Sequence, residues 1–385
     1  MSKFKAGIIG TGLTAAAHVE GIRKSGLGEV TAIAGISEKA AEEKAGELGI
    51  DRAYGKYMDL IKDPDIQVVH NCTPNSLHFP ISRAVLAANK HIVSEKPIAV
   101  DSREARLLLT AAERSKTVNA VMFNYRHHPV IAQFREMVQA GELGKIYAVH
   151  GSYLQNKFLY ETDYDWSVDA ETGGPSRVVA DIGMHWCDLV QFITGLKITE
   201  VVADIQTFLP ARKKSVSTVG TFGRAATPRH INVRVDTEDY GSILHRLQEG
   251  VRGALTLSQV SAGRKNRLFL QIDGSERSAA WDMEQPDALW LGQRDRPDQP
   301  APKKVKPSKT KPLSLKRFSA ERGEAWAIGA MNFLSKVYQY IADGKKPGRD
   351  PADFATFEDG YHAVVLTDGI LSSARQKRWK KTSME

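Results

Sequence analysis

Short apolar, β-branched runs alternate with helix-length amphipathic stretches through the first 125 residues of the chain. The apolar runs lie at 4–10, 30–37, 65–74, 91–97 and 117–125. Helical patterning fills 13–26, 38–49 and 78–89. Strands that alternate with helices of this length predict a parallel, doubly wound sheet.

The pattern changes after residue 125. A helical stretch at 129–144 precedes long candidate strands with glycine-containing connections, at 145–155, 200–209, 239–248, 251–261, 266–274 and 277–283. Further helical segments lie at 321–342 and 356–377. We therefore expect an α/β protein of two domains. Residues 1–125 would form the doubly wound domain, and residues 126–385 an α+β domain with a large open, mainly antiparallel sheet, whose C-terminal helix is free to pack back on the first domain.

The stretch from 178 to 190 places charged side chains inside an apolar run. At about 100° per residue, one helical face collects the apolar residues Val179, Ile182, Trp186, Leu189 and Ile193. Asp181, His185 and Asp188 form a polar row beside that face, because spacings of three and four place side chains on neighbouring turns. A polar row that borders a buried stripe predicts the wall of a cleft.

Composition and charge narrow the class of protein. The 385 residues are 42% hydrophobic and 25% charged, and no apolar run is long enough for a membrane span or a signal peptide, so we expect a cytoplasmic protein without a membrane partner. Part of the net charge of +8 lies in the Lys/Pro-rich segment 301–317. That segment lacks interleaved aromatics, and a solvated loop is preferred over nucleic-acid binding. Histidines and cysteines show no metal-ligand spacing, so no metal is expected.

Glycines mark the first strand-to-helix turn, in the sequence GIIGTGLTAA. Gly10 permits a tight turn, Gly12 lets a pyrophosphate approach the backbone, and Leu13 opens a helix whose N-terminus attracts phosphate. This predicts a dinucleotide site. The second strand ends with Gly35 and Ser37 where the aspartate that usually binds the ribose of NAD is expected, and Glu38 and Lys39 follow. Lys39 could attract a 2′-phosphate, so NAD and NADP both remain possible.

Three stretches together resemble the Gfo/Idh/MocA oxidoreductases: VVHNCTPNSLH (68–78), HIVSEKPIA (91–99) and DIGMHWCD (181–188). The resemblance implies a Rossmann domain, a second domain with an open antiparallel sheet, and NAD(P)-dependent oxidation of a secondary hydroxyl of a sugar, sugar derivative or cyclitol, or the reverse ketone reduction. It also implies a homodimer or homotetramer. Residue by residue, it matches Lys96, Asp181 and His185 to the family's catalytic positions, and it matches to cofactor-side positions Thr73, Asn75, His78 and Glu95, together with Lys96.

The chemistry of these residue types supports that assignment. A histidine suits proton transfer because its unperturbed pKa of about 6.5 lies near working pH, which makes His185 the candidate base. Asp181 would orient it or bind a hydroxyl, and Lys96 would stabilise developing negative charge on oxygen. We expect the substrate to contact these three and also Arg126, Tyr153, Trp166 and Arg177. Where a Trp-Arg pair is frequent in the family, this chain has Trp166 followed by serine, and Arg177 could supply the cation.

Two alternatives share the expected fold. One is an NAD-dependent glycoside-cleaving enzyme that oxidises its substrate transiently and regenerates the cofactor. The other is a sensor that binds dinucleotide and sugar without reaction. Retention of Lys96, Asp181 and His185 argues against the sensor, since binding alone has no need of all three. Net NADH production would separate the dehydrogenase from the glycoside-cleaving enzyme.

Overall fold

The structure is a computed structural model that describes residues 2–216, 229–294 and 324–382. The Lys/Pro-rich segment 301–317, interpreted above as a solvated loop, lies outside the described residues. The helix expected at 321–342 is described from Glu324 onward. No helix among the described residues is long and apolar enough to cross a membrane.

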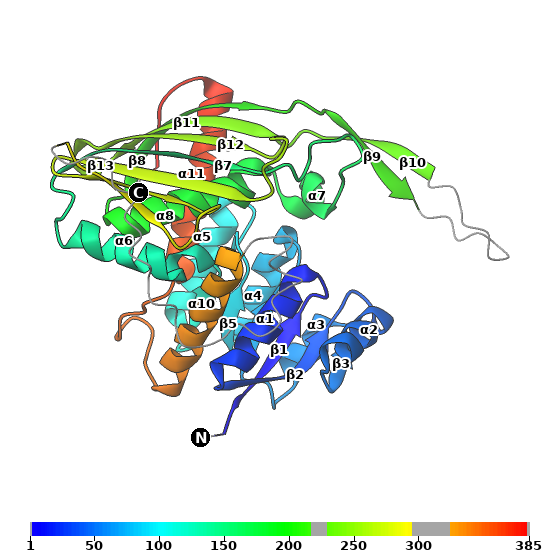
Figure 1. Ribbon diagram of the computed structural model, residues 1–385. Helices are drawn as coiled ribbons and strands as arrows, with labels where there is room; N and C mark the ends of the chain where they lie inside the picture. The colour runs from blue at the N-terminus through cyan, green and yellow to red at the C-terminus, as the bar shows by residue number, and fades with distance from the viewer. Residues whose placement is uncertain (1, 217–228, 295–323, 383–385) are drawn as a thin grey trace.

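The N-terminal part forms a six-stranded parallel sheet of order β3-β2-β1-β4-β5-β6 (Figure 1), which confirms the predicted doubly wound architecture. Its strands are β1 (Phe4–Ile9), β2 (Gly28–Ala34), β3 (Arg52–Tyr54), β4 (Val68–Asn71), β5 (His91–Ser94) and β6 (Asn119–Val121). The accompanying helices are α1 (Leu13–Ser25), α2 (Glu38–Leu48), α3 (Tyr57–Lys62), α4 (His78–Ala87) and α5 (Ser102–Arg114). The sequence analysis did not identify β3, α3 or α5.

Each strand of this sheet sends successive side chains to two different cores. Ile8 of β1 belongs to the core that contains α1, whereas its neighbour Ile9 belongs to the core that contains α4 and α5. Val68 and Val69 of β4 divide in the same way. This alternation follows from the two-residue period of a strand, and burial on both faces explains why the strands read as continuous apolar runs.

The second sheet has eight strands in the order β15-β14-β13-β7-β12-β11-β8-β16. The strands are β7 (Ile146–Leu154), β8 (Ile198–Gln206), β11 (Tyr240–Leu247), β12 (Arg252–Ser258), β13 (Arg267–Gly274), β14 (Ser278–Asp282), β15 (Leu289–Gly292) and β16 (Lys380–Lys381). All neighbours pair antiparallel except β7 and β12, which are parallel, so the mainly antiparallel sheet is confirmed. A separate ribbon, β9 (Ala211–Val216) and β10 (Arg229–Arg234), was not foreseen.

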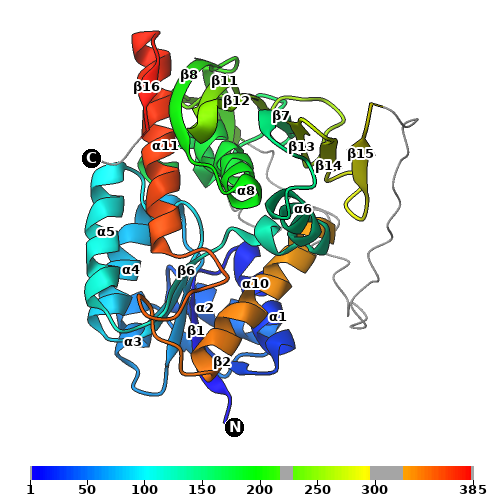
Figure 2. The same cartoon turned by 90° about the vertical axis from the view of Figure 1, so that its left-hand side faces the viewer.

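Helices cover one face of this sheet and connect it to the first (Figures 1 and 2). Short helical segments lie between the strands: η2 (Asn124–His127), η3 (Trp166–Val168), η5 (Gln248–Gly250) and α7 (Ala170–Gly173). The longer helices are α6 (Pro129–Gln139), α8 (Met184–Thr194), α10 (Glu324–Ala342) and α11 (Phe357–Gln376). Helix α10 packs along α1 and α11 along α5, so both C-terminal helices contact the parallel-sheet part of the molecule.

The charged stretch at 178–190 folds as a π-helical turn, η4 (Val179–Gly183), that continues into α8. The apolar face predicted there is confirmed, because Val179, Ile182 and Trp186 are at most 1% exposed. The Trp186 indole N–H donates to the carbonyl of Phe269 in β13 over 3.0 Å, which fixes the helix on the sheet. π-helical turns are rare and often occur at functional sites, and this one contains Asp181.

Candidate active site

The glycine turn after β1 has the geometry that a pyrophosphate requires. Gly10 has a φ of +111°, and a Cβ there would lie 2.5 Å from the carbonyl oxygen of Cys72. Gly12 precedes α1, and a Cβ on it would meet nothing within 4 Å. The first N–H groups of α1 have no side-chain cap, so they are available to an anion. These features fit the phosphates of a dinucleotide.

Exposed apolar side chains stand around the same edge of the parallel sheet. Leu13 at the start of α1 is 39% exposed, Ile36 after β2 is 95% exposed, and Leu77 after β4 is 41% exposed. All three follow the carboxyl ends of parallel strands, which is where doubly wound sheets bind dinucleotides. The flat, apolar faces of a dinucleotide's rings would cover such side chains. Of these three, only Leu13 was predicted from the sequence.

The end of β2 does not contain a built phosphate site. The Ser37 hydroxyl accepts the N–H of Ala40 at 3.2 Å and so caps α2. Lys39 points into solvent, with 84% of its side chain exposed, and lies 3.9 Å from Glu43. An exposed pair of this kind contributes little energy, so Lys39 is not fixed for binding a 2′-phosphate.

The cofactor-side residues after β4 hold a loop together. The Thr73 hydroxyl donates to Asn71 Oδ1 at 2.7 Å, and Asn75 Nδ2 donates to the carbonyl of Gly173 in α7 at 2.8 Å. His78 is 1% exposed, and its ring nitrogens lie 2.6 and 2.7 Å from the carbonyl oxygens of Pro97 and Thr73. His78 therefore holds the loop by its two backbone contacts. Its predicted contact with a cofactor does not fit, because the ring is buried and both nitrogens face carbonyl oxygens.

Lys96 and Asp181, distant in the chain, meet at the boundary between the two sheets. The Lys96 ammonium lies 2.7 Å from Asp181 Oδ1 and 3.0 Å from the Asp181 carbonyl oxygen. Only 11% of the lysine side chain is exposed, against 35% of the aspartate. Gln259 Nε2 donates to the second carboxylate oxygen at 3.0 Å. The pair therefore forms a partly desolvated, oriented charge site, as the sequence predicted.

His185 is four residues beyond Asp181 and is 6% exposed. Its ring packs edge-on against Tyr125, with ring centroids 4.9 Å apart, and against Phe123, with centroids 5.9 Å apart. Tyr125 also connects this ring to a second set of polar groups, because its hydroxyl lies 2.8 Å from that of Tyr153. The aromatic walls fix the imidazole in one place, which is a requirement for directed proton transfer.

A network of neutral polar groups surrounds Tyr153. Its hydroxyl donates to Asn266 Oδ1 at 2.8 Å, and Gln155 Nε2 donates to the same oxygen at 2.8 Å. Gln259 Nε2 donates to Gln155 Oε1 at 3.2 Å, which joins this network to the carboxylate of Asp181. The sequence analysis missed Gln259 and Asn266. Each flanks a long strand of the second sheet, and no local motif marks them.

Arg177 does not face the site. It is 1% exposed and ion-paired to Asp239, and its guanidinium donates to Gln259 Oε1 at 3.1 Å. Its predicted role as a substrate ligand is therefore incorrect, because a fully buried guanidinium has no room for a substrate. Arg177 instead orients the Gln259 amide that supports Asp181. Trp166 lies on η3 and is 44% exposed, and its predicted contact with the substrate stays a prediction.

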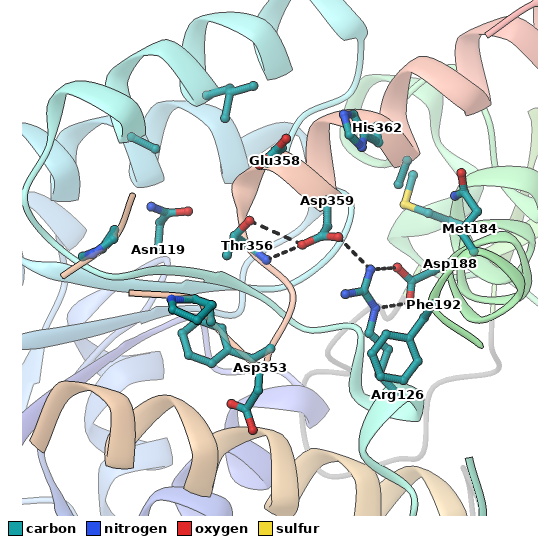
Figure 3. A pocket seen from close by; sticks show the side chains of 18 of the residues that line it. Asn119, Arg126, Met184, Asp188, Phe192, Asp353, Thr356, Glu358, Asp359 and His362 are labelled. Atoms are coloured by element: carbon teal, nitrogen blue, oxygen red, sulfur yellow. Dashed lines mark hydrogen bonds and ion pairs between the residues drawn. The ribbon is translucent and has the colours of Figure 1, made fainter. Parts of the chain in front are cut away.

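Arg126 lines a cavity that Lys96 and His185 do not line, and there it faces Asp188 and Asp359 (Figure 3). It donates to Asp188 through Nε at 2.8 Å and through Nη2, and also to Asp359 at 2.9 Å. The cavity of about 810 Å³ is lined by Met184, Asp188 and Phe192 of α8 and by residues of α5 and α11. Burial raises the pKa of Asp188 to about 6, against the lowering effect of Arg126. The predicted contact of Arg126 with the substrate is corrected: it bridges η2, α8 and α11.

The described residues contain no group of three or more histidine, cysteine, aspartate or glutamate side chains placed to hold a metal ion. The site therefore consists of a phosphate-binding turn, an exposed apolar edge, and a lysine–aspartate pair next to a packed histidine. Such an arrangement can bind a dinucleotide and hold an alcohol between a proton acceptor and a cation.

Solved structures of similar fold include complexes with a dinucleotide. "Levoglucosan dehydrogenase, complex with NADH and L-sorbose" superposes with a TM-score of 0.84 at 26% identity, over 100% of both chains. "Crystal structure of oxidoreductase domain protein from Kribbella flavida" superposes equally well, with a TM-score of 0.84 at 25% identity over 100% of both chains. These likenesses agree with the two-part architecture described above.

Curated relatives are similar over much of the chain. Levoglucosan dehydrogenase of Pseudarthrobacter phenanthrenivorans is 27% identical over 362 residues, which are 90% of this chain and 88% of the relative. Inositol 2-dehydrogenase of Salmonella typhimurium is 25% identical over 67% of this chain and 75% of its own. Residues 4–125 match the oxidoreductase family with an NAD-binding Rossmann fold, and residues 131–280 match the GFO/IDH/MocA C-terminal domain. The chain belongs to the Gfo/Idh/MocA family of oxidoreductases and has its NAD-binding Rossmann fold.

Proposed function

We propose that this protein is an NAD-dependent dehydrogenase that oxidises a secondary hydroxyl of a cyclic sugar, sugar derivative or cyclitol, or reduces the corresponding ketone. The proposal depends on one observation above all: the Lys96 ammonium lies 2.7 Å from Asp181 at the edge of the dinucleotide fold. The half-buried amide groups of Gln155 and Asn266 stand nearby, joined to this pair through Gln259, whereas Tyr153 is 2% exposed and holds Asn266 from behind. Such groups match the hydroxyls of a polyol.

The glycine turn and the exposed side chains of Leu13 and Ile36 would hold the dinucleotide. When bound, the nicotinamide accepts the hydride that leaves the alcohol carbon. Lys96, two residues beyond the carboxyl end of β5, would contact the nicotinamide end of the cofactor. The NAD-binding Rossmann fold of residues 4–125 supports NAD as the cofactor.

The protein's own groups handle the proton and the charge. His185 takes the hydroxyl proton, since a neutral imidazole is a base near neutral pH. Lys96 stabilises the negative charge that develops on the oxygen, and its desolvation strengthens that effect. Asp181 holds the ammonium in place and accepts a hydrogen bond from the substrate or the imidazole. In this scheme His185 and Lys96 act on the same oxygen.

Two finer assignments go with this function. The face of the second sheet away from the helices presents Leu244, which is 51% exposed, next to the exposed Ala254 of the paired strand. Exposed apolar side chains on a sheet face support a homodimer or homotetramer formed through that face. We also place the enzyme in the cytoplasm, as its composition suggested.

The test is absorbance of reduced nicotinamide with a panel of anhydrosugars, hexoses and inositols, each with NAD and with NADP. Turnover with at least one polyol is expected, and the Lys96→Ala variant should lose it. Absence of turnover above that control for every polyol would refute the dehydrogenase. Release of an aglycone from a glycoside without net NADH would favour the glycoside-cleaving alternative instead.

A further inference from the structure

A chain of buried polar side chains runs beneath helix α1. His18 of α1, His70 of β4 and Tyr338 of α10 are each 0% exposed. Tyr338 Oη lies 3.0 Å from His70 Nε2, His70 Nδ1 lies 2.8 Å from His18 Nδ1, and His18 Nε2 lies 3.4 Å from Glu95 Oε1. Four separate segments contribute to this chain, which ends at the residue preceding Lys96.

The two ends of this chain fix which groups donate. A carboxylate only accepts, so His18 Nε2 donates to Glu95 and, in a neutral ring, His18 Nδ1 accepts. His70 Nδ1 must therefore donate, which leaves its Nε2 to accept the hydroxyl proton of Tyr338. Burial holds the pKa of His70 well below its usual range and raises the pKa of Tyr338, so both groups are neutral.

The reverse order would leave one group unsatisfied. His70 Nε2 is the partner that the described residues offer to the buried Tyr338 hydroxyl, and if that nitrogen donated, the hydroxyl proton would have no acceptor. A buried donor without an acceptor is costly. Glu95 also accepts the Lys96 backbone N–H, which lies 3.3 Å from Oε2, and the negative charge of Glu95 contributes, after burial, to the raised pKa of the neighbouring Cys72 thiol.

We propose that Tyr338, His70 and His18 are positioning residues that hold Glu95 as an oriented carboxylate for the nicotinamide end of the cofactor. The inference rests on the proposed function. A fixed negative charge at that edge favours the cationic ring of NAD⁺ over the neutral ring of NADH. Tyr338, although it lies on α10, thereby raises the affinity for NAD⁺ relative to the affinity for NADH.

The first test uses the protein without cofactor. Nitrogen-15 NMR of the histidine side chains distinguishes the two neutral tautomers, and a His70→Gln variant identifies the His70 signals. We expect His70 to carry its proton on Nδ1 and His18 on Nε2 at neutral pH. A His70 ring protonated on Nε2 would overturn the proposed order of donors.

The second test measures equilibrium affinity for NAD⁺ and NADH in Tyr338→Phe. Tyr340→Phe is the matched control, because Tyr340 lies on the same helix, is 4% exposed and donates its hydroxyl to the Asp350 carbonyl at 2.8 Å. Loss of one hydrogen bond in the chain should weaken NAD⁺ binding about threefold relative to NADH, with no such change in the control. Equal ratios in the two variants would overturn the proposal. If the unmodified protein binds neither form of the cofactor, the proposed function fails. The tautomer measurement still decides the direction of the hydrogen bonds between Tyr338 and Glu95.

Discussion

Replacement of Arg126 by methionine tests the correction that the structure makes to the sequence prediction. Arg126 is bonded to Asp188, whose side chain is 5% exposed, and to Asp359, whose side chain is 27% exposed. Without the guanidinium, water can solvate Asp359, but Asp188 keeps a buried charge that has only the more distant Lys197 to offset it. Removal of one partner from a buried pair costs about 3–5 kcal/mol of unfolding free energy. We expect a loss of that size at pH 8.

The loss should shrink at lower pH. Burial already raises the pKa of Asp188 to about 6, and removal of Arg126 would raise it further, so the variant relieves its buried charge by taking up a proton. A group whose pKa is raised in the folded state contributes stability at low pH and loses it as pH rises. Arg126→Met should therefore be less destabilised at pH 5 than at pH 8.

Urea unfolding at both pH values measures this effect, and Arg126→Met/Asp188→Asn is the control, in which the charge is gone. The double variant should recover most of the loss at pH 8, because no uncompensated carboxylate remains. Substrate KM should change little in either variant. An unchanged unfolding midpoint together with a large rise in KM would refute the structural role and restore Arg126 as a substrate ligand.

Three further outcomes can be checked. The unfolding midpoint should fall as pH drops from 6.5 toward 4, because burial lowers the pKa of His128 and of His245 to about 4 and stability held by neutral histidines is lost on acidification; a flat profile would count against this. Gln259→Leu should lower kcat about tenfold, since a hydrogen bond to the charged Asp181 is worth about 1.5–3 kcal/mol, and an unchanged kcat would exclude that role. Ser37→Asp should preserve stability, since aspartate also caps helices, and should abolish activity with NADP but not with NAD; retained use of NADP would contradict our interpretation of this strand end.

Local patterns predicted what depends on local physics. Alternating strands and helices, the glycine turn at Gly10 and the apolar face of α8 are encoded in neighbouring residues, and all are present. The meeting of Lys96 with Asp181 followed from the family resemblance, because no local signal joins residues so far apart. The structure supplies the contact itself.

Contacts between distant segments were beyond sequence reasoning. Arg126 and Arg177 were assigned to the substrate because each lies near a motif, but both guanidinium groups turn toward buried carboxylates on other elements. Gln259 and Asn266 enter the site because the second sheet brings their strand ends to it. The parallel pairing of β7 with β12 is equally non-local, since Gly-containing connections indicated only antiparallel neighbours.

The central claim is that His185 and Lys96 act on one oxygen of the substrate. Single-turnover hydride transfer at saturating NAD and polyol tests it most directly, in His185→Gln, Lys96→Met and the double variant. Groups that act as a unit show strongly non-additive losses, so the double variant should be slower than the worse single variant by no more than about threefold. A double variant whose loss equals the product of the two single losses would mean that the two side chains act independently, and would contradict the account.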